Sequence, residues 1–368
     1  MSISALATAS RGPRRGAPWS AAMLRARRGA VAMSFSVLMV PMTLAVGGAI
    51  DYTHTVQFRT QLQGVVDSAA LSAATVYVST STSAAATTTS ANYMNAGIAS
   101  LPASSGVTFT TTPTVLTDSA GQTTGYQVVV TAKASMPTTF LGSIMSTIPV
   151  SVTATALNPV IYANPTAGNF KSSAWDANKL YWYIVPSGGG IPPSSALHLM
   201  FDNTLASQPS VSFQVAASQQ IGFALQNTTG GKQSYGNNQY GSTPGTTHTF
   251  YSNLSNPTNS ANGYNATDNR HNVNGVNGAN GNNCTLQTAV IPSSGVLPTP
   301  QSGTCFNTPI AYAAPSCTKL AGKSIFYSWN DMGGSIDDKD YNDAQFSFSC
   351  GGAGGGSATT PTTVVLTN

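Results

Sequence analysis

The sequence predicts a membrane-anchored α+β fold: a long N-terminal transmembrane helix, a small antiparallel sheet, and an all-β C-terminal sandwich of jelly-roll type. The first observation behind this prediction is an uncharged stretch at residues 30–50, behind an arginine-rich leader. The second is a set of Val- and Thr-rich alternating segments within residues 107–156. The third is a series of short apolar segments after residue 178, separated by Gly, Pro and Asn, which is typical of a sandwich.

The uncharged stretch is long enough to cross a membrane. Residues 30–50 at about 1.5 Å per residue span roughly the 30 Å hydrocarbon core of a bilayer. Pro41 is tolerated in such a helix, usually with a kink. A cleaved signal peptide is the alternative, but its apolar region is usually shorter. The leader, residues 1–29, contains arginines and no acidic residue, so the positive-inside rule keeps the N-terminus in the cytoplasm: Arg11, Arg14, Arg15, Arg25, Arg27 and Arg28.

The helical pattern continues beyond the membrane. Apolar residues recur on one helix face at Phe58, Leu62, Val65, Val66, Ala69 and Ala73. We therefore expect one helix from about Ala30 to Val78, ending at the low-complexity segment 79–91.

These residues also carry a family resemblance. An ordered set of residues resembles the N-terminal region of TadG-like Flp (tight-adherence) pilus-assembly proteins. The set comprises Arg27-Arg28-Gly29-Ala30-Val31-Ala32, Pro41, the segment 46–52, Arg59, Leu62-Gln63, Asp67 and the segment 69–74. The resemblance implies a pilin-like helix in the inner membrane, single-pass, with a periplasmic or extracellular C-terminal part. Its partners would be the inner membrane and other Tad/Flp pilus-assembly proteins.

The resemblance also suggests which helix residues have a role. Gly47 and Gly48 permit close approach of another helix, and we expect them to pack against other pilin-like helices together with Asp51, Tyr52, Leu62 and Asp67. Prepilins of such systems are typically cut after a Gly that precedes a short run ending in Glu. Ser34 stands at the corresponding place after Gly29, so we expect the helix to remain uncut. The Asp-x-Ser-x-Ser metal motif of some TadG-like proteins is missing from the sequence.

The remaining chain divides at changes in composition. We expect a pilin-like region at 51–158 with strands at 107–116, 126–134 and 150–156, a β-sandwich domain at 159–352 and a flexible tail at 353–368. The Asn- and Gly-rich segment 227–283 is expected to be a long surface loop. The sandwich strands are expected near residues 180, 196, 211, 220, 248, 324 and 344.

Four cysteines lie in the last quarter of the chain, at Cys284, Cys305, Cys317 and Cys350. In an oxidising compartment an even number predicts two disulfides, with three possible connectivities. Zinc is the alternative, but no pair has C-x-x-C spacing.

An acidic segment near the C-terminus is a candidate calcium site. Its candidate ligands are Asp331, Asp337, Asp338, Asp340, Asn342 and Asp343. Like charges this close repel one another unless a cation compensates. The alternative is that these side chains cap a tight turn through their own backbone. An EF-hand is excluded, because Asp343 occupies the position where an EF-hand needs Gly, and no Glu closes the site. The segment is instead similar to the Asp-Tyr-Asn-Asp signature of an uncharacterised β-sandwich domain of secreted bacterial proteins.

Composition excludes several functions. The sequence contains no Glu, charged residues make up 7%, and there is no basic patch with interleaved aromatics, so we expect neither an enzyme nor a nucleic-acid partner. His54, His198, His248 and His271 are scattered, and no hydrolase or metalloprotease motif is present. Two functions remain: a non-enzymatic component of pilus assembly, or a membrane-tethered or secreted calcium-dependent adhesin or carbohydrate-binding module.

Overall fold

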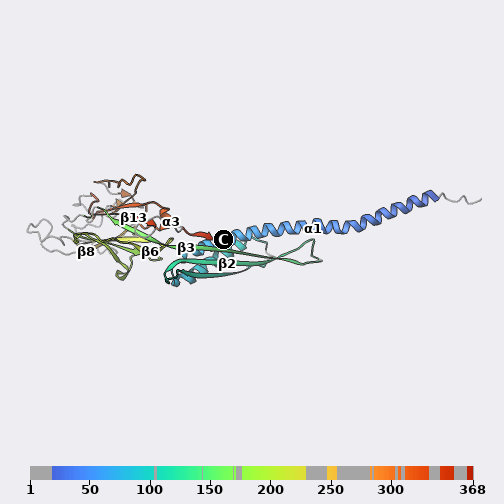
Figure 1. Cartoon of the computed structure of the whole chain (residues 1–368), viewed down its shortest axis with the longest axis horizontal. Helices are drawn as coiled ribbons and strands as arrows, with labels where there is room; N and C mark the ends of the chain where they lie inside the picture. The colour runs from blue at the N-terminus through green and yellow to red at the C-terminus, as the bar shows by residue number, and fades with distance from the viewer. Residues whose placement is uncertain are drawn as a thin grey trace, which may run out of the picture.

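The computed structural model shows a helix that extends as a long rod from one end of a β-rich body (Figure 1). It describes residues 19–102, 106–142, 144–168, 170, 176–228, 247–254, 282–283, 286–302, 306–307, 311–330, 340–351 and 363–367. The predicted fold class is confirmed: a long apolar N-terminal helix precedes antiparallel sheets that form a sandwich-like body. The candidate calcium residues Asp331, Asp337 and Asp338, with Cys284, Cys305, His271 and most of the predicted loop 227–283, lie outside the described residues.

Helix α1 (Trp19–Val76) is continuous and contains Pro41. Its two parts differ in burial. From Met33 to Val46 the apolar side chains are largely exposed, whereas Phe58, Leu62, Val66, Ala69 and Ala73 are buried. The predicted apolar face of the second part is therefore a core face, and it contacts β2 and β3.

The chain turns after α1 and re-enters a helix, which the sequence analysis did not predict. The hydroxyl of Thr82 accepts hydrogen bonds from the backbone N–H of Val78 and Ser79, and the 3₁₀ turn η1 (Thr80–Thr82) leads into α2 (Ser83–Ile98). The predicted hinge 79–91 is thus largely helical. Its alanines favour a helix, and the Thr87 and Thr88 hydroxyls bond to carbonyls one turn back. α2 packs closely on α1, because a Cβ on Gly97 would lie 2.4 Å from Val65 Cγ1.

The sheet beside these helices is an antiparallel meander of β1 (Thr108–Thr117), β2 (Thr123–Pro137) and β3 (Thr147–Ala167). β2 and β3 each turn alternate side chains toward the helices, including Val128, Val130, Val150 and Val152. The three predicted strands are present: β1 is shifted by one residue from its predicted bounds, and β2 and β3 extend beyond theirs at both ends.

β3 continues from this sheet into the body, so the expected boundary at 158/159 lies inside a strand. Its first part pairs with β2, and its last residues pair with β13 (Ala344–Gly351) and β6 (Phe213–Ala216). The expected boundary would place Asn158 at the end of one region and Pro159 at the start of the next. Asn158 is instead fully buried in β3 and hydrogen-bonded to neighbouring segments.

The body is built from two sheets with aromatic side chains between them. One has the order β3-β13-β12-β10, with β12 at Ile325–Trp329 and β10 at Leu286–Val290. The other has the order β5-β4-β7-β8, with β4 at Ala177–Ile184, β5 at His198–Asp202, β7 at Ile221–Thr228 and β8 at Thr247–Tyr251. The short strands β9 (Asn282–Asn283) and β11 (Phe306–Asn307) pair separately, and η3 (Ser194–Ala196) precedes β5.

The last strand, β14 (Val365–Thr367), returns to the helix-covered sheet and pairs with β3 at Thr155, Ala156 and Leu157. Part of the tail that was expected to be flexible is therefore a strand. The run Thr362-Thr363-Val364-Val365-Leu366 has β-forming residues, which is the signal that the tail assignment overlooked.

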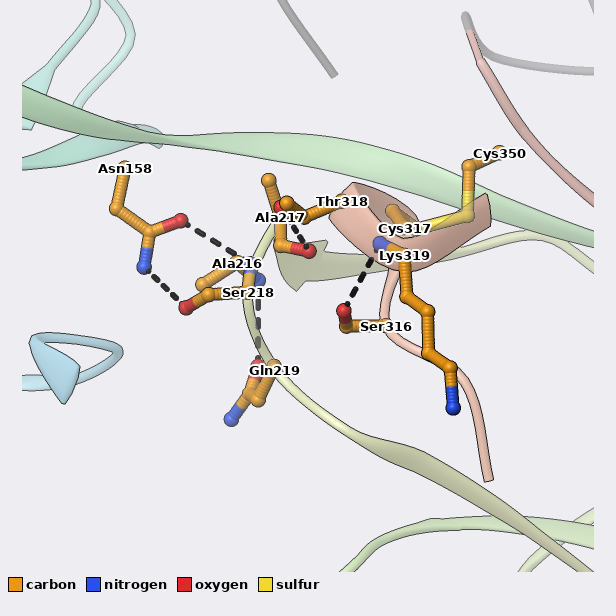
Figure 2. The surroundings of a disulfide bond; sticks show 10 residues. All are labelled: Asn158, Ala216, Ala217, Ser218, Gln219, Ser316, Cys317, Thr318, Lys319 and Cys350. Carbon is orange, nitrogen blue, oxygen red and sulfur yellow. Dashed lines mark hydrogen bonds between the residues drawn. A yellow bond between two sulfur atoms is a disulfide. The ribbon is translucent and has the colours of Figure 1, made fainter. Parts of the chain in front are cut away.

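One disulfide joins Cys317 in α3 (Cys317–Leu320) to Cys350 in β13, which are separated by 33 residues in the sequence (Figure 2). With this pair formed, the second predicted disulfide would join Cys284 to Cys305, and it stays a prediction because both lie outside the described residues. A cross-link closing a loop of this length stabilises a protein by about 4 kcal/mol through the lost freedom of the unfolded chain.

We expect the double variant Cys317→Ala/Cys350→Ala, which leaves no unpaired thiol at this site, to lower the free energy of unfolding by about 4 kcal/mol. The reason is that the unfolded chain regains the freedom that the disulfide removes. Urea denaturation of the double variant and the wild type under non-reducing conditions measures this. Equal midpoints with equal slopes would show that the disulfide adds nothing.

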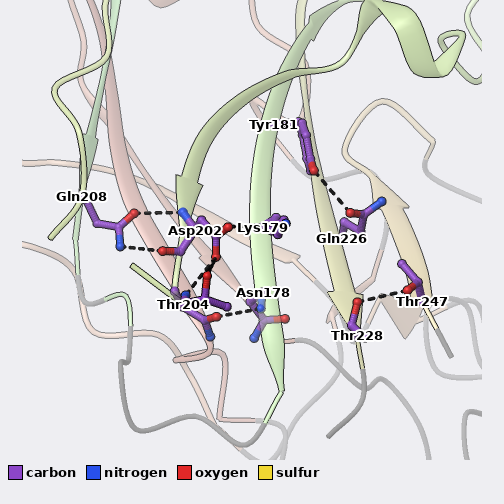
Figure 3. A network of polar contacts seen from close by, with 10 residues as sticks. Asn178, Lys179, Tyr181, Asp202, Thr204, Gln208, Gln226, Thr228 and Thr247 are labelled. Carbon is purple, nitrogen blue, oxygen red and sulfur yellow. Dashed lines mark hydrogen bonds and ion pairs between the residues drawn. The ribbon is translucent and has the colours of Figure 1, made fainter. Parts of the chain in front are cut away.

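A network of hydrogen bonds and an ion pair surrounds Asp202, where β5 ends beside Lys179 of β4 (Figure 3). Asp202 Oδ1 accepts hydrogen bonds from the backbone N–H and the hydroxyl of Thr204 at 2.9 and 2.6 Å, and Asp202 Oδ2 lies 3.5 Å from Lys179 Nζ. Burial alone would raise the pKa of Asp202, but the hydrogen bonds from Thr204 and the charge of Lys179 outweigh it and lower the pKa below its ordinary value of 3.8.

The sign of the resulting pH dependence follows from this lowered pKa. Asp202 contributes stability that is present above about pH 4 and is lost as the pH falls through its folded-state pKa, because the unfolded state then binds the proton more readily. We expect the Asp202→Asn variant to lose less stability than the wild type between pH 4 and pH 2, as measured by thermal melts across that range. Parallel curves for the two proteins would contradict the assignment.

Candidate functional site

The site that the structure builds is the contact between α1 and the connection between β2 and β3. We call the described residues of this connection, 138–142 and 144–146, the hairpin tip. In Figure 1 the β2–β3 hairpin extends beyond the body along α1. The contact occurs at Gly47, Gly48 and Asp51, where the exposed part of the helix meets its packed part.

Asp51 holds the hairpin tip through its carboxylate. Oδ1 accepts a hydrogen bond from the backbone N–H of Thr139 at 3.0 Å, and Oδ2 accepts from those of Phe140 and Leu141 at 2.9 and 2.8 Å. Asp51 is only 3% exposed. Three backbone donors therefore satisfy this carboxylate, and hydrogen bonds to a charged acceptor are among the stronger ones in proteins.

The two glycines make room for the same tip. A Cβ on Gly47 would lie 2.4 Å from Phe140 Cβ, and one on Gly48 would lie 3.6 Å from Leu141 Cδ1. Gly47 thus permits a close approach that any side chain would prevent. In this structure the close neighbour of both glycines is a loop of the same chain, and their packing against other pilin-like helices stays a prediction.

The other helix residues that the sequence analysis singled out lie in different surroundings. Tyr52 is 68% exposed, and Leu62 is fully buried in the core beneath the sheet. Asp67 Oδ1 accepts a hydrogen bond from Gln63 Nε2 at 2.6 Å, and Gln63 Nε2 also reaches the carbonyl of Thr153 on β3. Gln63, which also bonds to Asp67 on its own helix, therefore connects α1 to β3.

The C-terminal end of α1 is fixed to the body by side chains that sequence analysis did not identify. Asn158 Nδ2 donates to the carbonyl of Tyr77 at 3.1 Å, and Ser218 Oγ donates to that of Thr75 at 2.6 Å. Asn158 and Ser218 also bond to each other, as Figure 2 shows. Because the last carbonyls of a helix lack partners within it, these bonds satisfy groups that would otherwise need water.

The same junction reaches the disulfide. Ala217 donates its N–H to the carbonyl of Pro159 at 2.8 Å, and its own carbonyl accepts from the N–H and hydroxyl of Thr318 in α3. Since Cys317 is bonded to Cys350 of β13, the contacts form a continuous connection from β3 through α3 to β13 (Figure 2).

Three of the candidate calcium residues are described. Asp340 Oδ1 accepts the backbone N–H of Asn342 at 3.0 Å, and the Asn342 amide also donates to Asp340 Oδ2. This is the turn-capping arrangement that the sequence analysis weighed as the alternative, and Tyr341 between them has a positive φ of 53°. Among the described residues, no group of three His, Cys, Asp or Glu side chains is placed to hold a metal ion. Calcium binding stays a prediction.

The histidines do not meet within the described residues. His54 is exposed on α1, and His198 on β5 stacks on Trp182, with 4.4 Å between ring centroids. His248 lies in β8.

Within the described part of the chain, α1 is the helix that is long and apolar enough to cross a membrane, with a candidate span within Met33–Val76.

No curated protein and no solved structure matches the chain. A family model described as "Putative Flp pilus-assembly TadE/G-like" matches residues 29–76. The matched segment begins one residue before the apolar stretch and ends at Val76, the last residue of α1. It includes Gly47, Gly48 and Asp51. The predicted resemblance of the N-terminal region is therefore confirmed: residues 29–76 are similar to the TadE/G-like Flp pilus-assembly domain.

Proposed function

We propose that the chain is a non-enzymatic, single-pass component of the inner membrane that takes part in assembling Flp pili and carries its β-rich body outside the cytoplasm. One observation carries the proposal: the matched family segment is a helix whose first part exposes apolar side chains. Met33, Phe35, Val37 and Leu38 are each 60% exposed or more. Such a surface is stable in lipid rather than in water.

The orientation follows from charge. Six of the fifteen basic residues of the chain precede the apolar stretch, and the rest of the chain has nine basic residues against eleven aspartates. The positive-inside rule then keeps the N-terminus in the cytoplasm and the body outside. A disulfide within the body suits an oxidising compartment.

Complementation tests the role in assembly. In a strain whose gene for this chain has been deleted, we expect few or no Flp pili by electron microscopy, and the full chain should restore them. The matched control replaces residues 33–46 with a Leu- and Ala-rich span of equal length, which keeps the anchor but changes its surface. Normal piliation in the deletion strain would refute the proposal, and restoration by the control would show that the helix is only an anchor.

Topology is tested separately. We expect a protease added to intact spheroplasts to digest the body, while the chain remains in the membrane after alkaline extraction. Protection of the body in spheroplasts, with digestion after lysis, would place it in the cytoplasm.

A second candidate function is calcium-dependent binding by the body. The observation that favours it is that Asn342 Oδ1, in the acidic segment, is buried without a hydrogen-bond donor among the described residues. A buried acceptor of this kind suits a cation or an ordered water. Calorimetric titration of the detergent-solubilised full chain with calcium tests it, with Asn342→Leu as the variant and Asp118→Asn as a control at a distant turn. No heat and no rise in melting temperature with the wild type would contradict it.

A further inference from the structure

The hairpin tip exposes apolar side chains, whereas the outer faces of β2 and β3 are mostly polar. Phe140, Ile144 and Met145 are 50%, 71% and 44% exposed. The sequence from Thr138 to Ser146 contains no charged residue. At the opposite end of β2, the turn after β1 has Asp118, Ser119 and Gln122 instead. The apolar tip at one end of the sheet therefore suits contact with lipid, whereas the polar turn at the other end suits contact with water.

The position of the tip along α1 is fixed by its contacts. Phe140 lies against Gly47, and Asp51 binds the tip one helical turn further on, about 6 Å along the helix axis. The uncharged stretch that we expect to cross the membrane ends at Ile50. The tip therefore lies level with the last turn of the crossing segment, where the acyl chains of a bilayer give way to an interfacial region roughly 5 to 7 Å thick on each side.

Several backbone N–H groups of the tip donate hydrogen bonds to acceptors within the protein and so do not depend on water. Asp51 accepts the N–H groups of Thr139, Phe140 and Leu141. The N–H groups of Ile144 and Met145 both donate to the carbonyl of Leu141 at 2.8 Å, and that of Thr138 donates to Ser146. Because unsatisfied amide groups are costly in lipid, a loop that enters a bilayer needs such internal partners.

We propose that the hairpin tip is a second membrane contact, which inserts Phe140, Ile144 and Met145 into the outer boundary of the bilayer that α1 crosses. The inference rests on the proposed membrane crossing of α1. Its ligand is the lipid surface itself, through the acyl chains next to the headgroups, and no lipid type is selected because the tip offers no charge. Asp51 acts as the positioning residue, since it sets how close to the helix, and so how deep, the tip lies.

Photo-crosslinking in the full chain tests this. The photoreactive residue p-benzoylphenylalanine replaces Ile144, and the protein is reconstituted into vesicles of phosphatidylethanolamine and phosphatidylglycerol with radiolabelled acyl chains. The matched control carries the same residue in place of Ala120, which is exposed in the turn at the other end of β2. Met145 serves as a second tip position if the variant at 144 does not accumulate.

We expect several-fold more acyl-chain adduct from position 144 than from position 120. Equal yields at the two positions would overturn the inference, and so would an adduct from position 144 to a second copy of the chain in place of lipid. Alkaline extraction of the same vesicles separates the two proposals. A chain that resists extraction but gives no lipid adduct at 144 keeps its anchor and refutes the tip contact, whereas a chain that is extracted refutes both.

Discussion

Asp51→Ala is expected to release the hairpin tip from α1 and to accelerate amide exchange at Thr139, Phe140 and Leu141 by roughly a hundredfold. The change removes the acceptor of all three backbone N–H groups, and a hydrogen bond to a charged group is worth enough to shift a local opening equilibrium tenfold or more. Hydrogen exchange monitored by mass spectrometry on the chain in nanodiscs measures it, with peptides covering 138–146 compared between variant and wild type.

The control for this experiment is Asp118→Ala. Asp118 caps the turn at the other end of β2 by accepting from the N–H groups of Ala120 and Gln122 at 2.9 and 2.8 Å. It should loosen that turn and leave exchange at the tip unchanged. Undiminished protection of residues 139–141 in Asp51→Ala would mean that Gly47 and Gly48 alone hold the tip.

The second large effect is expected from Phe223→Ala in the body. Phe223 on β7 is fully buried, and its ring packs edge-on against Tyr327, Phe346 and Phe348 of the facing sheet, with centroids 4.9 to 5.1 Å apart. Removing a buried phenylalanine loses its transfer free energy and leaves a cavity, at a cost of about 4 kcal/mol. Urea denaturation measures the change.

Leu199→Ala on β5 is the comparison for Phe223→Ala, because Leu199 is 50% exposed in the same body. Its effect should stay below about 1 kcal/mol. Equal losses in the two variants would show that the aromatic contacts between the sheets are not what stabilises the body.

The sequence predicts those elements of the fold that leave a local pattern. The buried face of α1 was predicted from its spacing, because one helix face repeats every three to four residues, and Phe58, Leu62, Val66, Ala69 and Ala73 are buried. The strands of the meander were predicted from alternation, and β2 buries every second residue from Val128 to Met136. α2 was missed because Ser, Thr and Ala repeats fit both a spacer and a helix, and tertiary contact with α1 decides between them.

The long-range features could not be predicted from local patterns. Asp51 meets residues that lie 88 to 90 positions away in the sequence, and Asn158 caps a helix end 81 positions before it. Gly47 and Gly48 predicted a close approach, since glycine has no side chain to prevent one, but nothing in the sequence identified Phe140 as the partner. The strand β14 in the tail that was expected to be flexible was missed for the same reason, because it pairs with β3 from far along the chain.

The course of β3 has a mechanical consequence. This strand is 21 residues long, which at about 3.3 Å per residue corresponds to roughly 70 Å, and it belongs to both the sheet that covers α1 and the sheet of the body. A pull on the body would therefore load the hydrogen bonds of β3 lengthwise, many at once, instead of stretching a loose connection. The continuous strand thus couples the body rigidly to the sheet that covers α1. A force applied to the body is therefore transmitted to the anchoring helix with little extension of the chain between them.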